Sequence, residues 1–188
     1  MKSLSFANKV TIVRILTVPF FIATVLYYVP ECDYLRLVAL GIFLVAVITD
    51  VIDGYIARTR KEKTKAGAIL DPLADKLLLI SAFICLYKIR ILLGDIQLPL
   101  WLVVAVISRD VMLLLGSGII YLVHGRLDIT PSKWGKATTF FQILCILGIL
   151  LQWPFSVYLW YAAAVLTLIS AVGYIRDGIK VLNNPRSP

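Results

Sequence analysis

Four aspartates lie close together in a chain that is otherwise strongly apolar: Asp50, Asp53, Asp71 and Asp75. In a helix, spacings of three and four residues return to the same face, so each pair of aspartates forms one stripe. Two antiparallel helices joined by the polar segment 59–66 would bring the stripes face to face. An ionised carboxylate in lipid costs about 3 kcal/mol on the most lenient insertion scale. The cluster therefore predicts a site that holds positive charge.

The carboxylates predict divalent cations as that positive charge. Four ionised carboxylates carry a charge of about −4, which two divalent ions would neutralise. A donor set made only of oxygens suits Mg²⁺ or Mn²⁺ and does not suit a structural zinc ion. Two such ions can clamp the attacking and leaving oxygens of an in-line phosphoryl displacement. The expected chemistry is thus displacement at phosphorus, at head-group level, on a phospholipid precursor.

Small residues accompany the aspartates. Gly54 and Ala57 follow the first pair and Gly67 precedes the second. Residues without bulky side chains let helices or a ligand approach the backbone closely. Arg58 is then expected at the rim of a pocket lined by carboxylates.

The elements that position this cluster follow from composition. The chain has 188 residues, 60% of them hydrophobic, with a mean hydropathy of +0.90. Apolar runs close to the ~20 residues that span a bilayer predict an all-α integral membrane protein with six transmembrane helices. These runs are 10–29, 35–56, 68–86, 98–123, 136–151 and 155–175. We expect one membrane domain, 1–188, in which 1–9 is a short interfacial segment.

The basic residues predict the orientation of the chain. The N-terminus, the segment 58–65, the connection 126–136 and the C-terminal tail hold 13 of the 19 lysines and arginines. Because basic residues concentrate in cytoplasmic loops, both termini and the aspartate site are expected on the cytoplasmic side of the inner (cytoplasmic) membrane. The same charge would attract anionic lipid head groups or a phosphorylated substrate. It forms no soluble basic patch, so no nucleic-acid partner is expected.

Other catalytic arrangements find little support. The single histidine, His124, is predicted at a helix end, and the three cysteines have no pair spacing. Ser-His-Asp and Cys-His catalysis therefore have no basis. Cys85 and Cys145 lie in apolar runs, where a thiol is usually a small hydrophobic group.

The aspartate motif resembles the signature of the CDP-alcohol phosphotransferases (phosphatidyltransferases). Its eight fixed positions are complete and correctly spaced: Asp50-x2-Asp53-Gly54-x2-Ala57-Arg58-x8-Gly67-x3-Asp71-x3-Asp75. Asn8-x2-Thr11-x2-Arg14 resembles the start of the family's first helix. Residues 70–76 resemble the phosphatidylglycerophosphate synthases, which the chain resembles most, and the eukaryotic-type cardiolipin synthases. Residues 131–138 resemble the former, whereas 107–112 resemble the cardiolipin synthase branch.

This resemblance implies a reaction and roles for the motif residues. The family transfers a phosphatidyl group from CDP-diacylglycerol to an alcohol, releases CMP, and is usually a homodimer of six-helix subunits. By motif position, Asp50, Asp53, Asp71 and Asp75 would ligate two divalent cations, and Asp75 would be the general base. The family's CDP-binding positions correspond to Asp53, Gly54, Ala57, Arg58 and Gly67.

Intramembrane arginines predict either ion pairs or phosphate binding. Asp110 lies about 100° from Arg109 around a helix, so a local ion pair is not favoured. Arg109 is then expected either to bridge helices, or to hold the acceptor's phosphate together with Lys133, Lys136 or Arg176. Arg14 could do either.

The leading acceptor is sn-glycerol 3-phosphate, which would give phosphatidylglycerophosphate. Phosphatidylglycerol, giving cardiolipin, is the second and inositol phosphate the third. A cation or proton transporter, in which the aspartates form a path for cations, is an alternative function of another class. All four aspartates cluster at one membrane end, which argues against such a path. A scaffold with buried ion pairs would need compensating cations near the aspartates, and only Arg58 and Lys76 are expected close to them.

Overall fold

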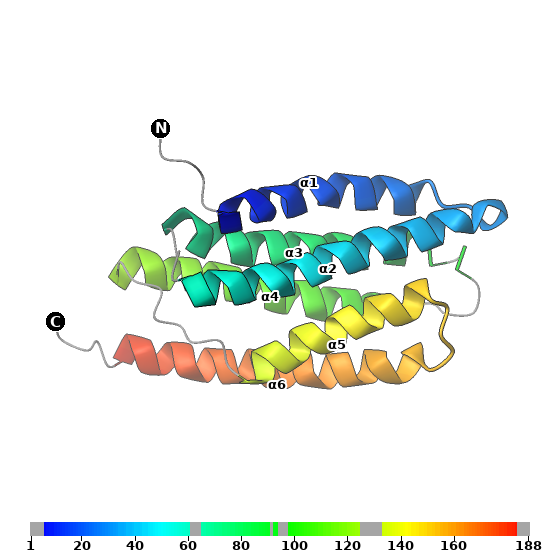
Figure 1. The fold of residues 1–188 in the computed structure, drawn as a ribbon. Helices are drawn as coiled ribbons and strands as arrows, with labels where there is room; N and C mark the ends of the chain where they lie inside the picture. Colours follow the sequence, from blue (N-terminus) through cyan, green and yellow to red (C-terminus); the bar gives the residue numbers. More distant parts are fainter. Residues whose placement is uncertain (1–5, 61–64, 91, 94–97, 125–132, 184–188) are drawn as a thin grey trace. The chain divides into compact units, whose positions relative to one another are not determined.

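The computed structural model describes residues 6–60, 65–90, 92–93, 98–124 and 133–183. This part of the chain is all-α, as predicted, with six α-helices and one short 3-10 helix (Figure 1). The elements are α1 (Phe6–Leu26), η1 (Pro30–Cys32), α2 (Tyr34–Arg60), α3 (Lys65–Lys88), α4 (Leu100–His124), α5 (Lys133–Leu150) and α6 (Ser156–Asn183). Since α1 begins at Phe6, residues 6–9 of the predicted interfacial segment form its first turn.

The chain divides into two compact units. Unit 1 comprises Met1–Leu98 together with Ile149–Trp153, and unit 2 comprises Pro99–Gly148 together with Pro154–Pro188. Unit 1 therefore contains α1, α2 and α3, and the last two residues of α5. Unit 2 contains α4, the rest of α5, and α6.

In unit 1, α1 packs against both α2 and α3. The short connection through η1 makes α1 and α2 antiparallel, which Figure 1 shows for the blue and cyan helices. The rings of Phe21 and Phe43 are fully buried, with centroids 5.8 Å apart. Buried aromatic rings contribute about 0.5–1.5 kcal/mol beyond the area they bury. This contact fixes the register of α1 on α2.

In unit 2, α6 contacts both α4 and α5. Arg109 and Leu113 of α4 bond to Ser170 and Tyr174 of α6, so these two helices run in parallel. The Thr138 hydroxyl donates to the Leu166 carbonyl at 3.0 Å, which joins α5 to α6. Near the turn between them, a Cβ added to Gly148 would lie 3.2 Å from a methyl group of Leu159. Glycine therefore permits the close approach of these helices.

The turn after α5 needs an unusual backbone conformation. Gln152 has a φ of 52°, and its N–H donates to the Ile149 carbonyl at 2.9 Å. Left-handed residues of this kind often end helices, because they satisfy carbonyls of the last turn. This one reverses the chain between α5 and α6.

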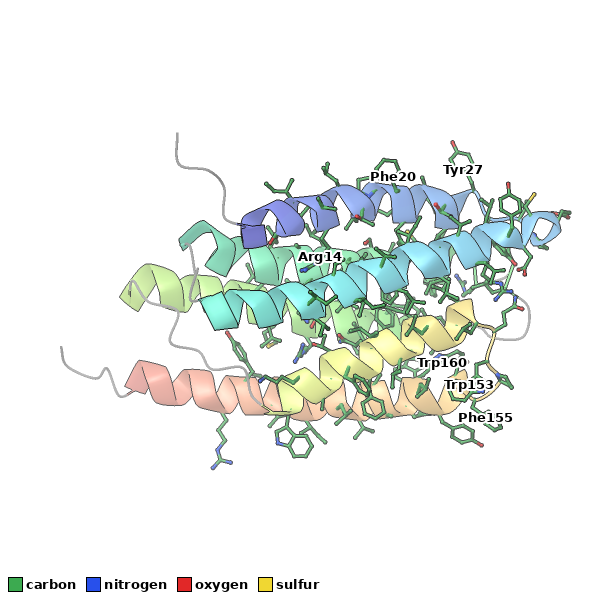
Figure 2. The ribbon with its side chains drawn as sticks, in the orientation of Figure 1. Arg14, Phe20, Tyr27, Trp153, Phe155 and Trp160 are labelled. Atoms are coloured by element: carbon green, nitrogen blue, oxygen red, sulfur yellow. The ribbon has the colours of Figure 1, made fainter. Side chains whose placement is uncertain are left out.

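Much of the apolar surface faces outward. Within the described residues, two stretches are long and apolar enough to cross a membrane, Tyr34–Ile52 and Ser156–Arg176, and Thr11–Leu26 and Trp134–Leu150 are shorter apolar helices. Only 17% of the most apolar window of the first stretch and 33% of that of the second are buried within the protein. Large outward-facing apolar surfaces of this kind are suited to lipid. Figure 2 shows Phe20 and Tyr27 directed away from the other helices of unit 1.

Candidate active site

All four aspartates lie on helices, as predicted. Asp50 and Asp53 belong to the C-terminal half of α2, and Asp71 and Asp75 to the N-terminal half of α3. Because the backbone is helical, residues three and four positions apart lie on the same face of each helix, as expected. The structure describes the side chains of Asp50 and Asp75. The other motif side chains lie outside the described residues: Asp53, Gly54, Ala57, Arg58, Gly67 and Asp71.

Asp50 is paired with an arginine from another helix. Nη1 of Arg14, on α1, lies 2.5 Å from Oδ1 of Asp50. The arginine side chain is 3% exposed, whereas the aspartate side chain is 41% exposed. Of the two roles predicted for Arg14, the structure shows the interhelical ion pair.

Asp75 lies on α3 between two buried neighbours. Ala74 is fully buried and Lys76 is 9% exposed, whereas Asp75 is half-buried. The Asp75 carboxyl is therefore less enclosed than the residues on either side of it. A general base needs such access, because it must come within hydrogen-bonding distance of the proton it accepts.

The described donors fit a hard cation. No group of three or more His, Cys, Asp or Glu side chains occurs within the described residues, which include two of the four predicted carboxylates. Both of these, Asp50 and Asp75, offer only oxygen donors, the type that Mg²⁺ and Mn²⁺ prefer. Their partial exposure gives an ion access from water.

A second ion pair closes the other end of unit 1. Arg36 donates from Nε and Nη2 to the two carboxylate oxygens of Asp33, at 2.7 and 2.6 Å, and from Nη1 to the Leu150 carbonyl. The Tyr28 hydroxyl also lies 3.5 Å from Asp33 Oδ1. The hydrogen bond from Arg36 lowers the pKa of the Asp33 carboxyl below its ordinary value. This pair lies far along α2 from the aspartate motif and offers a natural control for it.

Arg109 corrects one prediction. Its Nη1 lies 2.7 Å from Oδ1 of Asp110, the neighbour with which a local pair was not expected. The local pair forms although the two Cβ atoms point in different directions, because an arginine side chain has enough rotatable bonds to fold back to its neighbour. Both side chains are almost fully buried, and buried charges require a partner. A second donor, Nη2, bonds to Ser170 Oγ on α6 at 2.6 Å.

The other predicted phosphate ligands lie on different helices of unit 2. Lys136 is exposed on α5 and Arg176 is exposed on α6, whereas Arg109 is buried on α4. Lys133 is the first residue of α5, and its side chain lies outside the described residues. The exposed pair is available to an anion from water, and Arg109 is enclosed by its own partners.

Two polar residues of unit 2 were not predicted. Ser170 holds Arg109 from α6, and Gln142 is fully buried on α5, with no hydrogen bond to either amide atom within the described structure. Ser170 lies 61 positions from Arg109, so no local pattern could have indicated the contact. For Gln142, an amide inside an apolar run was the available signal.

The chain is similar to known proteins over most of its length. A sequence model described as CDP-alcohol phosphatidyltransferase matches residues 4–169. The chain is 36% identical over 186 residues to a probable phosphatidylglycerophosphate synthase of Mycobacterium tuberculosis, covering 96% of this chain and 84% of the relative.

Two further relatives are named CDP-diacylglycerol–glycerol-3-phosphate 3-phosphatidyltransferase. The protein from Haemophilus influenzae is 32% identical, covering 92% of this chain and 88% of the relative. The protein from Bacillus subtilis is 29% identical, covering 93% of this chain and 95% of the relative. The match to the family begins before α1 and ends within α6, so it includes the whole aspartate motif. The resemblance noted in the sequence is thereby confirmed, and the chain belongs to the CDP-alcohol phosphatidyltransferases, a family of membrane enzymes.

Proposed function

We propose that this protein is a CDP-diacylglycerol–glycerol-3-phosphate 3-phosphatidyltransferase, which forms phosphatidylglycerophosphate and CMP. The observation that supports this most is the shared name of its relatives. Proteins from Haemophilus influenzae, Aquifex aeolicus and Bacillus subtilis carry it, and each matches more than four fifths of this chain. The complete aspartate motif supports the same reaction, because carboxylates that hold divalent cations suit transfer between phosphates.

The four aspartates hold the cations. The family uses divalent metals, and Asp50, Asp53, Asp71 and Asp75 would bind two ions of Mg²⁺ or Mn²⁺. When bound, these ions neutralise the diphosphate of the substrate and stabilise the departing CMP. By motif position, the nucleotide would contact Asp53, Gly54, Ala57, Arg58 and Gly67.

The reaction is one displacement at phosphorus. A hydroxyl oxygen of glycerol 3-phosphate attacks the phosphorus that carries the diacylglycerol. The bond from that phosphorus to the oxygen shared with CMP breaks, and CMP leaves with the electron pair. Asp75 accepts the proton of the hydroxyl. Arg109, Lys133, Lys136 and Arg176 supply positive charge for the acceptor's own phosphate.

The membrane arrangement completes the proposal. The chain forms one domain of six transmembrane helices in the cytoplasmic (inner) membrane, with both termini and the site on the cytoplasmic side, and pairs as a homodimer. The distribution of basic residues supports the orientation.

Cys32 provides a test of this orientation. It lies in η1 between the first two helices and is partly exposed, whereas Cys85 and Cys145 are buried. A membrane-impermeant thiol reagent should label Cys32 from outside intact cells. Cys32→Ser is the control, and labelling confined to inverted vesicles would reverse the orientation.

The acceptor is tested directly. Purified protein is incubated with CDP-diacylglycerol and one acceptor at a time, glycerol 3-phosphate, phosphatidylglycerol or inositol phosphate, and CMP release is measured. We expect release with glycerol 3-phosphate, and phosphatidylglycerophosphate as the lipid product. CMP release with phosphatidylglycerol only would identify a cardiolipin synthase, the branch that residues 107–112 resemble.

The site is tested by substitution and metal removal. Chelation should abolish turnover, and Mg²⁺ or Mn²⁺ should restore it. Asp50→Asn and Asp53→Asn should lose both cation affinity and turnover, whereas Asp75→Asn should keep more CDP-diacylglycerol binding than it keeps turnover. Asp33→Asn, at the opposite end of unit 1, is the matched control and should retain activity. Full turnover in excess chelator would exclude the two-metal mechanism.

A further inference from the structure

Arg14 is a buried charge of unit 1 that the proposed reaction does not use. It lies on α1, which contributes none of the motif aspartates, yet its guanidinium contacts one of them, Asp50. Figure 2 shows the Arg14 side chain directed from α1 toward the helices packed beneath it. Burying a guanidinium costs free energy unless the group is paired with an opposite charge and hydrogen-bonded.

The packing of α1 on α2 sets the position of this contact. Arg14 lies seven residues before Phe21, and Asp50 lies seven residues after Phe43. In antiparallel helices these equal offsets, about two turns, place the ion pair in the same register as the buried ring contact. Because α1 packs on α3 as well as on α2, it contacts both helices that carry the motif aspartates. Arg14 therefore belongs to a helix whose position is fixed against both halves of the motif.

The contact leaves the carboxylate able to bind a cation. Arg14 is within 2.5 Å of one oxygen, Oδ1, and a carboxylate has two oxygens with about four lone-pair sites. The Asp50 side chain is 41% exposed, so water and ions reach it from the side away from Arg14. Carboxylates that ligate metals are commonly held by such partners, whose loss costs about 10–100-fold in metal affinity or activity.

We propose that Arg14 is a positioning residue, whose guanidinium holds the Asp50 carboxylate in the orientation that binds a divalent cation. The proposal depends on Asp50 being a metal ligand, as in the proposed function. Repulsion between the guanidinium and the cation acts in the opposite direction, but solvent at the exposed carboxylate screens it. The direction of the change in affinity therefore separates positioning from repulsion.

The experiment measures equilibrium binding of Mn²⁺ to the purified full-length protein in detergent, from the electron paramagnetic resonance signal of the free ion. Arg14→Ala should weaken Mn²⁺ binding by about 10–100-fold. Arg14→Lys keeps the charge and loses the planar fork, so its Mn²⁺ affinity should lie between those of Arg14→Ala and the unsubstituted protein. Arg36→Ala removes the arginine of the other ion pair and should leave Mn²⁺ affinity unchanged. Thermal unfolding of each variant verifies folding, and Arg14→Lys serves if Arg14→Ala does not fold.

A double substitution tests whether Arg14 acts through Asp50. In the Asp50→Asn background, adding Arg14→Ala should cause no further loss of Mn²⁺ affinity, because the carboxylate to be positioned is gone. Unchanged or tighter binding by Arg14→Ala, or an equal further loss in the Asp50→Asn background, would overturn the positioning role. If Asp50→Asn itself binds Mn²⁺ as the unsubstituted protein does, the metal site of the proposed function fails instead.

Discussion

Two buried arginines, one in each unit, have their charge balanced by an aspartate in different ways. Arg14 and Arg109 are 3% and 4% exposed, and each pairs with an aspartate. The partner of Arg14 lies on another helix and is 41% exposed, whereas the partner of Arg109 is its own neighbour and is fully buried. The open pair leaves a carboxylate accessible to water and ions, whereas both side chains of the enclosed pair are shielded from water.

The strongest test of this contrast removes each carboxylate. Asp110→Ala leaves the Arg109 charge buried, and breaking a buried pair costs about 3–5 kcal/mol. Asp50→Ala should cost less stability, because water that reaches the Asp50 position can also solvate the Arg14 guanidinium. Thermal unfolding in one detergent measures both. Equal losses would remove the distinction between the open and the enclosed pair.

The role of Arg109 in acceptor binding gives the next largest effect. If Arg109 holds the acceptor's phosphate, Arg109→Ala removes a contact worth about 1.5–3 kcal/mol and should raise the KM for glycerol 3-phosphate about 10–150-fold. The KM for CDP-diacylglycerol should change much less. Ser170→Ala is the control, since it removes the contact with α6 and keeps the charge. A lower melting temperature with both KM values unchanged would show that the enclosed pair is structural only.

The enclosure of Arg109 depends on how closely α4 and α6 approach. A Cβ added to Gly116 would lie 2.8 and 2.9 Å from two ring carbons of Tyr174, so Gly116→Ala must displace that ring. Overpacking of this kind costs about 1–3 kcal/mol. Gly118→Ala meets nothing within 4 Å and should be neutral or stabilising, as alanine favours helices by up to about 1 kcal/mol. Similar unfolding temperatures for both variants would show that the α4–α6 contact yields easily.

The smallest effect concerns the ion pair of Asp33 and Arg36, in which only the aspartate is exposed. The pKa of Asp33 is lowered in the folded protein, so its contribution to stability is complete above the ordinary value of 3.8 and is lost as the pH falls through the lowered value. The difference in melting temperature between the unsubstituted protein and Asp33→Asn should therefore be constant near neutral pH and shrink below about pH 4. A difference that grows on acidification would contradict the assigned sign.

The helices could be predicted because their signal is local. The run predicted for 136–151 is α5, Lys133–Leu150, and the run predicted for 35–56 is α2, which continues to Arg60. The partners of buried charges were not predictable in the same way. Asp50 is 36 positions from Arg14, and which helix α1 would face at that level depends on packing such as that of Phe21 on Phe43. The aspartate motif was found because its members are close in sequence. Arg14 was expected to form an interhelical ion pair or to bind phosphate, but the sequence did not identify Asp50 as its partner.

The participation of Ile149–Trp153 in unit 1 bears on the order in which the protein is made. Arg36, at the start of α2, donates to the carbonyl of Leu150, which is translated only after α3, α4 and most of α5. During synthesis the first three helices are therefore made before this partner of Arg36 exists. Unit 1 is therefore completed late, and a chain truncated after residue 98 would lack the contact between Arg36 and the Leu150 carbonyl.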